Sequence, residues 1–138
     1  MIKQLKLLWK VAQWVVAWRF EDGDYILKQT IRKKTRFGMI EVPKGFQYDG
    51  MTCFPDGPHG ELLRVAAIHD FCYETAWFNR IDSDMLLREE IIDVGIALGK
   101  EKEYTVMADI VFKGVRKFGL LPWMKARVLQ SRKRMEIV

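Results

Sequence analysis

Apolar residues recur at intervals of three and four along the second half of the chain, and this period predicts helices. The predicted helices cover residues 61–78, 82–98 and 101–118, with a fourth that has Pro122 near its first turn. Gly99 and Gly119 follow the second and third apolar rows, where a glycine commonly ends a helix. This half of the chain is therefore expected to be helical.

The first half has a different pattern. Residues 3–18 predict an amphipathic helix with a wide apolar arc, and residues 19–48 predict a small antiparallel β-meander. The Asp22-Gly23 pair is a hairpin signal, and the Lys33–Arg36 run is expected to be a solvated turn. Residues 49–60 carry the glycines and prolines of an irregular loop. Together the two halves predict one α+β domain over residues 1–138.

Charge and cysteine content indicate the kind of partner and the cellular compartment. The net charge of +5 favours an anionic partner, either a small molecule or a lipid surface, although a basic surface can also serve solubility alone. No nucleic-acid motif stands out, so sequence-specific nucleic acid is not expected. Cys53 and Cys72 do not form a disulfide framework, which favours a reducing cytoplasm.

The opening segment allows two interpretations. Lysines interrupt the apolar residues of 3–18, so the segment is too short and too charged to span a bilayer. It also lacks the cleavage site of a signal peptide. Its tryptophans and lysines suit an interfacial membrane helix, and its wide apolar arc suits packing against the core or a second copy of the chain.

One pair of predicted helices directs titratable groups inward. One-turn spacing places His69 and Tyr73 on the apolar row of the first helix, and Asp84 one turn before Leu87 on the row of the second. Because burying an unpaired charge is costly, His69 and Asp84 are expected to meet. A carboxylate that orients a histidine is half of a general-base device, so His69, Asp84 and Tyr73 are the candidate catalytic residues.

A cation is a further expectation at this place. Asp70 points slightly off the apolar row, and the loop 49–60 leads directly into the helix that carries it. A glycine-bearing loop can offer backbone carbonyls, and Asp49 can add a carboxylate, which together form a ligand set that Ca²⁺ accepts. Asp70 and Asp49 are therefore the candidate ligands of a divalent cation.

The order of several short motifs resembles an uncharacterised family of small phage and prophage proteins. The motifs are Gly45-Phe46, Asp49-Gly50 followed by Thr52, Ala67-Ile68-His69-Asp70-x-x-Tyr73, and Arg80-x-x-x-Asp84. The likeness covers about residues 42–118. It implies a host-cytoplasmic or virion location but no assured activity. Thr52 and Arg80, which belong to these motifs, are the candidate substrate- or anion-binding residues.

The inner motif also resembles the phospholipase A2 signature, in which His-Asp-x-x-Tyr on one helix faces a buried Asp on the next. That resemblance implies an antiparallel helix pair with His69 as the base that activates water, Asp70 as a calcium ligand, Tyr73 as a network phenol and Asp84 as the orienting carboxylate. Disulfide-rich members pair a cysteine at position 72 with one at the position of Ser83. This chain therefore resembles the disulfide-free, capsid-borne viral lipases, and its Tyr48-Asp-Gly lacks the full glycine spacing of their calcium loop.

Three functions are compatible with these patterns. The first is a metal-assisted hydrolase of carboxylic esters in which His69 and Asp84 activate water. The second is a hydrolase or binder of phosphodiesters or nucleotides that acts against host defence signalling, with His59 as an extra ligand in one version. The third is a non-enzymatic virion or interaction protein whose inward polar residues pin two helices together.

Overall fold

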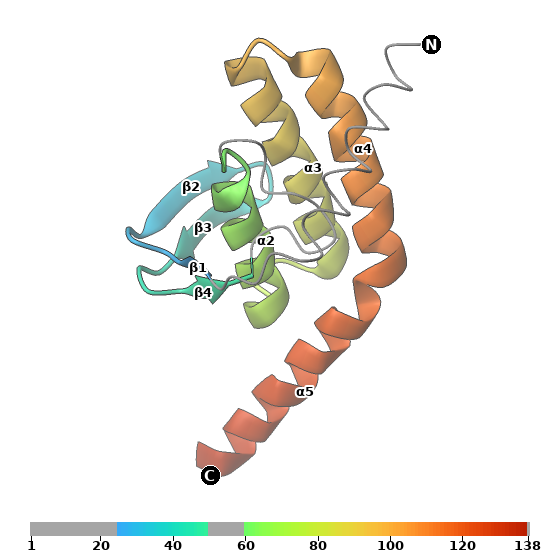
Figure 1. Cartoon of the computed structure of the whole chain (residues 1–138). Helices are drawn as coiled ribbons and strands as arrows, with labels where there is room; N and C mark the ends of the chain where they lie inside the picture. The colour runs from blue at the N-terminus through green and yellow to red at the C-terminus, as the bar shows by residue number, and fades with distance from the viewer. Residues whose placement is uncertain (1–24, 50–59, 138) are drawn as a thin grey trace.

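The computed structural model describes residues 25–49 and 60–137, and it confirms an α+β architecture (Figure 1). Four short strands precede four helices in the described residues. The strands are β1 (Tyr25–Ile26), β2 (Ile31–Thr35), β3 (Gly38–Val42) and β4 (Gln47–Tyr48). The helices are α2 (Leu63–Thr75), α3 (Arg80–Ala97), α4 (Glu101–Phe118) and α5 (Leu120–Ile137). The predicted helix over residues 3–18 and the Asp22-Gly23 hairpin lie outside the described residues.

In the described part of the chain the predicted antiparallel strand region consists of two two-stranded sheets, which together form one ribbon. Strand β1 pairs with β4, β2 pairs with β3, and both pairs follow the same register, so the chain runs out and back once. The expected turn over Lys33–Arg36 is wrong in its position, because Lys33 and Thr35 lie in β2. The turn comes later, where the Thr35 hydroxyl accepts from the Phe37 amide and donates to the Gly38 carbonyl.

The Lys33 side chain was expected in solvent, and the structure places it against α3 instead. Its Nζ lies 2.5 Å from Oε2 of Glu90, whose side chain is 8% exposed. The neighbouring pair of Arg36 and Glu89 is more open to water. Because an exposed ion pair contributes little and a buried carboxylate needs a partner, the Lys33 contact is the more important of these two ion pairs between the strands and α3.

Helix α2 ends earlier than the apolar row predicts. Ala76 adopts a left-handed conformation with φ of 53°, which stops the helix, and its side chain is exposed although it belongs to the predicted row. Asn79 then begins α3, because its side chain accepts a hydrogen bond from the Asp82 amide at 2.8 Å. The short link between these two residues makes α2 and α3 antiparallel neighbours.

Helices α3 and α4 come into close contact at a glycine. A Cβ on Gly95 would lie 2.3 Å from the Cβ of Tyr104, so only glycine allows this crossing. The predicted apolar rows hold in the middle of both helices and are wrong at their ends. Leu98 and Phe118, at the carboxyl ends of α3 and α4, are 49% and 64% exposed.

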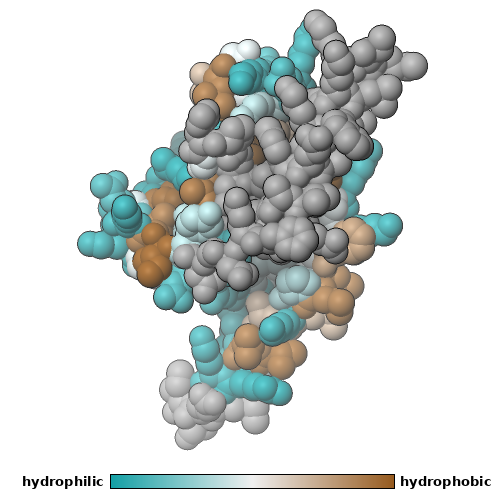
Figure 2. Space-filling model, in the orientation of Figure 1, coloured by the Kyte–Doolittle hydropathy of each residue, from teal (hydrophilic) through white to brown (hydrophobic). Residues whose placement is uncertain are grey.

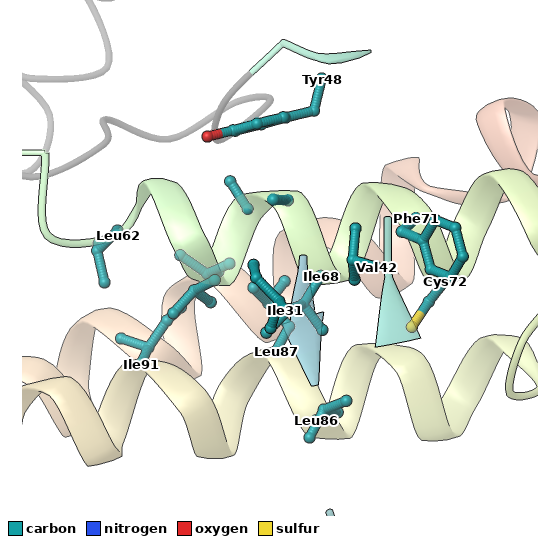
Figure 3. Packing of buried hydrophobic residues seen from close by; sticks show 14 of the residues in the cluster. Ile31, Val42, Tyr48, Leu62, Ile68, Phe71, Cys72, Leu86, Leu87 and Ile91 are labelled. Atoms are coloured by element: carbon teal, nitrogen blue, oxygen red, sulfur yellow. The ribbon is translucent and has the colours of Figure 1, made fainter. Parts of the chain in front are cut away.

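The core lies between the ribbon, α2, α3 and α4. Figure 3 shows α2 with Tyr48 on one side and α3 on the other, where Ile68 meets Leu87. The core residues that are almost fully enclosed come from every layer: Ile40, Val42, Leu62, Ile68, Ile91 and Met107. This packing holds α2 and α3 in a fixed relation, which is what a site made from both helices requires.

Helix α5 leaves the body at an angle to α4 (Figure 1). Two arginines fix its origin by binding the carboxyl ends of other helices. Arg80 donates to the carbonyls of Val115 and Arg116 at 3.0 and 2.8 Å, and Arg127 donates to the carbonyls of Tyr73 and Glu74. The Val115 carbonyl also accepts from the Gly119 amide at 2.8 Å. The guanidinium groups thus add hydrogen bonds at the carboxyl ends of α4 and α2, where the last carbonyls of a helix lack the regular intrahelical donors. Among the described helices, none combines the length and apolar character needed to cross a bilayer.

Candidate functional site

A buried carboxylate is the centre of the candidate site. The side chain of Asp84 is 0% exposed and receives three hydrogen-bond donors. His69 Nε2 lies 2.9 Å from Oδ1, and the Tyr73 hydroxyl donates to the same oxygen at 2.6 Å. Arg116 donates from Nη1 to Oδ2 at 2.8 Å. The expected meeting of His69 and Asp84 is therefore present, with two further partners.

Local sequence explains why these groups converge. His69 and Tyr73 are one turn apart on α2, and their rings lie 4.4 Å apart between centroids. Asp84 lies in the first two turns of α3, directly across from them. Buried apolar residues before and after these positions on both helices turn the same faces inward, so the polar groups are carried into the interior by their neighbours.

The electrostatic balance favours an ionised Asp84. Burial alone would raise the pKa of its carboxyl, but the hydrogen bonds from His69, Tyr73 and Arg116 outweigh burial and place the pKa below its usual value. Burial and the adjacent Asp84 carboxylate raise the pKa of the Tyr73 phenol, and Arg80 only partly opposes this. At neutral pH the site therefore contains a carboxylate that accepts and a protonated phenol that donates.

The hydrogen bond to Asp84 determines which nitrogen of the His69 ring carries the proton. Because an ionised carboxylate can only accept, His69 Nε2 carries the proton that it shares with Asp84. The other ring nitrogen, Nδ1, is then the one with a lone pair when the ring is neutral. The side chain of His69 is 11% exposed, so the ring is at the border of the network whereas Asp84 is fully enclosed.

The junction between α4 and α5 lies against this network. A Cβ on Gly119 would be 2.6 Å from the Tyr73 hydroxyl, so a larger residue would displace the phenol or the helix. Trp123 packs edge-on against the Tyr73 ring at 5.2 Å, and the Arg127 guanidinium lies 4.4 Å from the centre of the Trp123 ring. Helix α5 is thus in direct contact with a member of the site.

The remaining candidate residues differ in position. Asp70 is half-buried on α2 beside His69, and Asp49 is exposed just after β4. Arg80, a candidate for anion binding, uses its guanidinium on the end of α4. Thr52 and His59 lie outside the described residues, as does most of the loop 49–60 that was expected to supply cation ligands.

The described side chains do not by themselves form a metal site. Within residues 25–49 and 60–137, no three His, Cys, Asp or Glu side chains come close enough to hold an ion together. Asp70 supplies one carboxylate next to His69, and one carboxylate does not complete the coordination of Ca²⁺. The fit of a cation therefore depends on oxygen ligands from outside the described ranges.

Arg116 is the member of the network that the sequence did not reveal. It lies in the last turn of α4, where a basic residue is ordinarily explained by the helix dipole. Its position 32 residues after Asp84 gives no local pattern that would connect the two. Trp123 and Arg127 were missed for the same reason, since both reach the site only after the chain turns at Gly119.

Comparison with known proteins adds no assignment. No protein-family model, no curated protein and no solved structure matches the chain. The resemblances to the phage family and to the phospholipase A2 signature therefore rest on the motifs alone, and the functional argument rests on the geometry of the network.

Proposed function

We propose that this protein is a hydrolase in which His69, oriented by Asp84, takes a proton from the water that attacks a carboxylic ester. The observation that supports this most is the 2.9 Å contact between His69 Nε2 and a carboxylate that is completely enclosed. A histidine held by a buried carboxylate in this way can act as a general base through its second nitrogen.

Each residue has a separate role in the proposed reaction. His69 Nδ1 accepts the proton from water while the oxygen of that water bonds to the carbonyl carbon of the ester. The resulting imidazolium is stabilised by the charge of Asp84, which keeps its own ionised state because its pKa is low. The tetrahedral intermediate then collapses, the bond between the carbonyl carbon and the ester oxygen breaks, and His69 gives its proton to the leaving alkoxide. Tyr73 and Arg116 are positioning residues, since both bind Asp84.

A divalent cation, with Ca²⁺ as the first candidate, remains part of the proposal. Asp70 would be its carboxylate ligand and Asp49 a second one, with the rest supplied by oxygen atoms of the loop 49–60. When bound beside the substrate, such an ion would stabilise negative charge on the carbonyl oxygen. The steps assigned to His69 and Asp84 follow from the hydrogen bonds of this chain and do not depend on that ion.

A second function is favoured by the completeness of the network. Three donors satisfy Asp84, and a fully satisfied buried network is also what a structural pin between helices requires. In that case the protein would be a virion or interaction protein without turnover. On the resemblance to phage proteins, both proposals would have the protein act in the host cytoplasm or in the virion.

A substrate panel tests the proposal. The full chain is incubated with phosphatidylglycerol vesicles and, separately, with a dinucleotide phosphodiester, each with Ca²⁺ and with EDTA. Release of fatty acid, followed by mass spectrometry, supports the ester hydrolase, and its loss in EDTA supports the cation. Cleavage of the phosphodiester alone would move the proposal to nucleotide substrates. Absence of turnover on both substrates would favour the structural pin.

A further inference from the structure

Helix α5 presents an apolar stripe that faces away from the body of the protein. Leu121, Met124 and Val128 follow one another at one-turn spacing and are 77%, 52% and 52% exposed. Leu120 and Leu129 border the stripe and are also about half exposed, at 49% and 46%. A run of large exposed apolar side chains on one helix is unusual for a surface that meets only water.

The opposite face of α5 is used to anchor the helix. Trp123 packs on Tyr73, and Arg127 donates to the carbonyls at the end of α2. These contacts fix the rotation of α5 about its axis, so the apolar stripe on its other face points outward. Helix α5 therefore has one face committed to the protein and a second face without a described partner inside residues 25–49 and 60–137.

The charges beside the stripe are all positive. Lys125 lies next to it, Arg132 continues it by one turn beyond Val128, and Lys133 and Arg134 follow, all four exposed. No acidic residue occurs between positions 120 and 135. Figure 2 shows the result, with brown apolar side chains between teal ones along the part of the molecule where α5 projects.

The positive charge beside the stripe distinguishes between three possible partners: a second copy of α5, a nucleic acid and an anionic bilayer. Two copies of α5 packed together would bring their basic residues close to one another, and like charges in contact oppose association. A nucleic acid would neutralise the cations but would leave Leu121, Met124 and Val128 in contact with phosphates and water. An anionic bilayer satisfies both features, because the apolar side chains enter the acyl region and the cations remain among the headgroups.

We infer that α5 docks this protein onto anionic lipid bilayers through Leu121, Met124 and Val128, with Lys125 and Arg132 binding the headgroups. This docking is independent of hydrolysis. It deepens the proposed function only in one respect, since Trp123 connects the docked helix to Tyr73 and would hold the His69 network near the membrane surface.

The test measures binding to vesicles whose lipids carry no carboxylic ester. The full chain is mixed with vesicles of ether-linked phosphatidylcholine, alone or with ether-linked phosphatidylglycerol, and bound protein is separated by flotation. We expect binding only when phosphatidylglycerol is present, and weakening as salt is raised. Binding to both vesicle types alike would overturn the role of the cations, and binding to neither would overturn the inference.

Paired variants locate the binding surface. Leu121→Gln with Val128→Gln should lower the partition coefficient at least tenfold, and Lys125→Gln with Arg132→Gln should remove the preference for phosphatidylglycerol. The matched control is Met39→Gln with Ile96→Gln, which changes residues that are 58% and 54% exposed on other elements. Equal binding by the first pair and the control would overturn the assignment to α5.

The molecular mass in solution tests whether a second copy of the chain covers the stripe. Light scattering should give the same monomeric mass for the wild type and the Leu121→Gln, Val128→Gln variant. A dimer in the wild type that is lost in this variant would show that a second copy covers the stripe, and the inference would be overturned. Because the vesicles contain no carboxylic ester, failure of the binding test leaves the ester hydrolase proposal untouched, and failure of that proposal leaves docking intact.

Discussion

Replacement of Asp84 by asparagine tests the buried network most sharply. The substitution keeps the size of the side chain and removes its charge. The amide oxygen can still accept from His69 and Tyr73, but the amide nitrogen then faces the Arg116 guanidinium, so that two donors oppose each other. The change isolates the contribution of the carboxylate charge.

The expected cost follows from burial and from the number of partners. Removing one partner of a buried ion pair costs about 3–5 kcal/mol, and a hydrogen bond to a charged group is worth about 1.5–3 kcal/mol. Arg116 is 33% exposed and can turn towards water, which lowers the penalty. We therefore expect Asp84→Asn to reduce the free energy of unfolding by about 2–4 kcal/mol. A domain of this size with roughly 0.05–0.15 kcal/mol per residue remains folded after that loss.

The assay is urea unfolding followed by far-ultraviolet circular dichroism. Asp109→Asn is the matched control, because Asp109 also pairs with an arginine, Arg88, at 2.7 Å but is 48% exposed. An exposed pair of this kind contributes about 0–1 kcal/mol. A loss for Asp84→Asn that does not exceed the loss for Asp109→Asn would refute the view that the enclosed carboxylate holds α2, α3 and α4 together.

Three further changes test the Asp84 network and the packing of α3 on α4. The pKa of Asp84 is lower in the folded protein, so its contribution to stability is present above about pH 4 and is lost as the pH falls through the folded pKa. The urea midpoint of the wild type should therefore fall more steeply with decreasing pH than that of Asp84→Asn. Parallel curves for the two proteins would contradict this. Gly95→Ala should reduce the free energy of unfolding by about 1–3 kcal/mol because its Cβ would meet Tyr104. Gly114→Ala, with nothing within 4 Å, should stabilise α4 by about 0.5–1 kcal/mol. The reverse order in thermal unfolding would show that α3 and α4 are not closely packed at Gly95. Tyr73→Phe should reduce the free energy of unfolding by about 1.5–3 kcal/mol through loss of one hydrogen bond to a carboxylate, and urea unfolding without a measurable loss would remove the phenol from the network.

The helical part of the fold could be predicted because its signals are local. The apolar period and Gly119 gave the bounds of the helix over residues 101–118. The same period placed His69, Tyr73 and Asp84 on facing rows. Helix ends were harder to predict from the sequence, because Ala76 stops α2 through a left-handed conformation that an alanine rarely adopts.

What the sequence could not reveal depends on distant contacts. The Lys33 side chain binds the buried carboxylate of Glu90, which lies 57 residues away. Arg116 enters the network from a third helix for a similar reason. A basic residue at a helix end has a sufficient local explanation, so nothing in its own neighbourhood indicates a buried partner.

The role of His69 is decided by the rate of ester hydrolysis by His69→Gln relative to the wild type, with both proteins shown to be equally folded. If His69 is the base that Asp84 orients, the rate on phosphatidylglycerol vesicles should fall by about 10²–10⁴-fold. An unchanged rate in His69→Gln, or a wild type that releases no fatty acid under any condition that supports vesicle contact, would contradict the account.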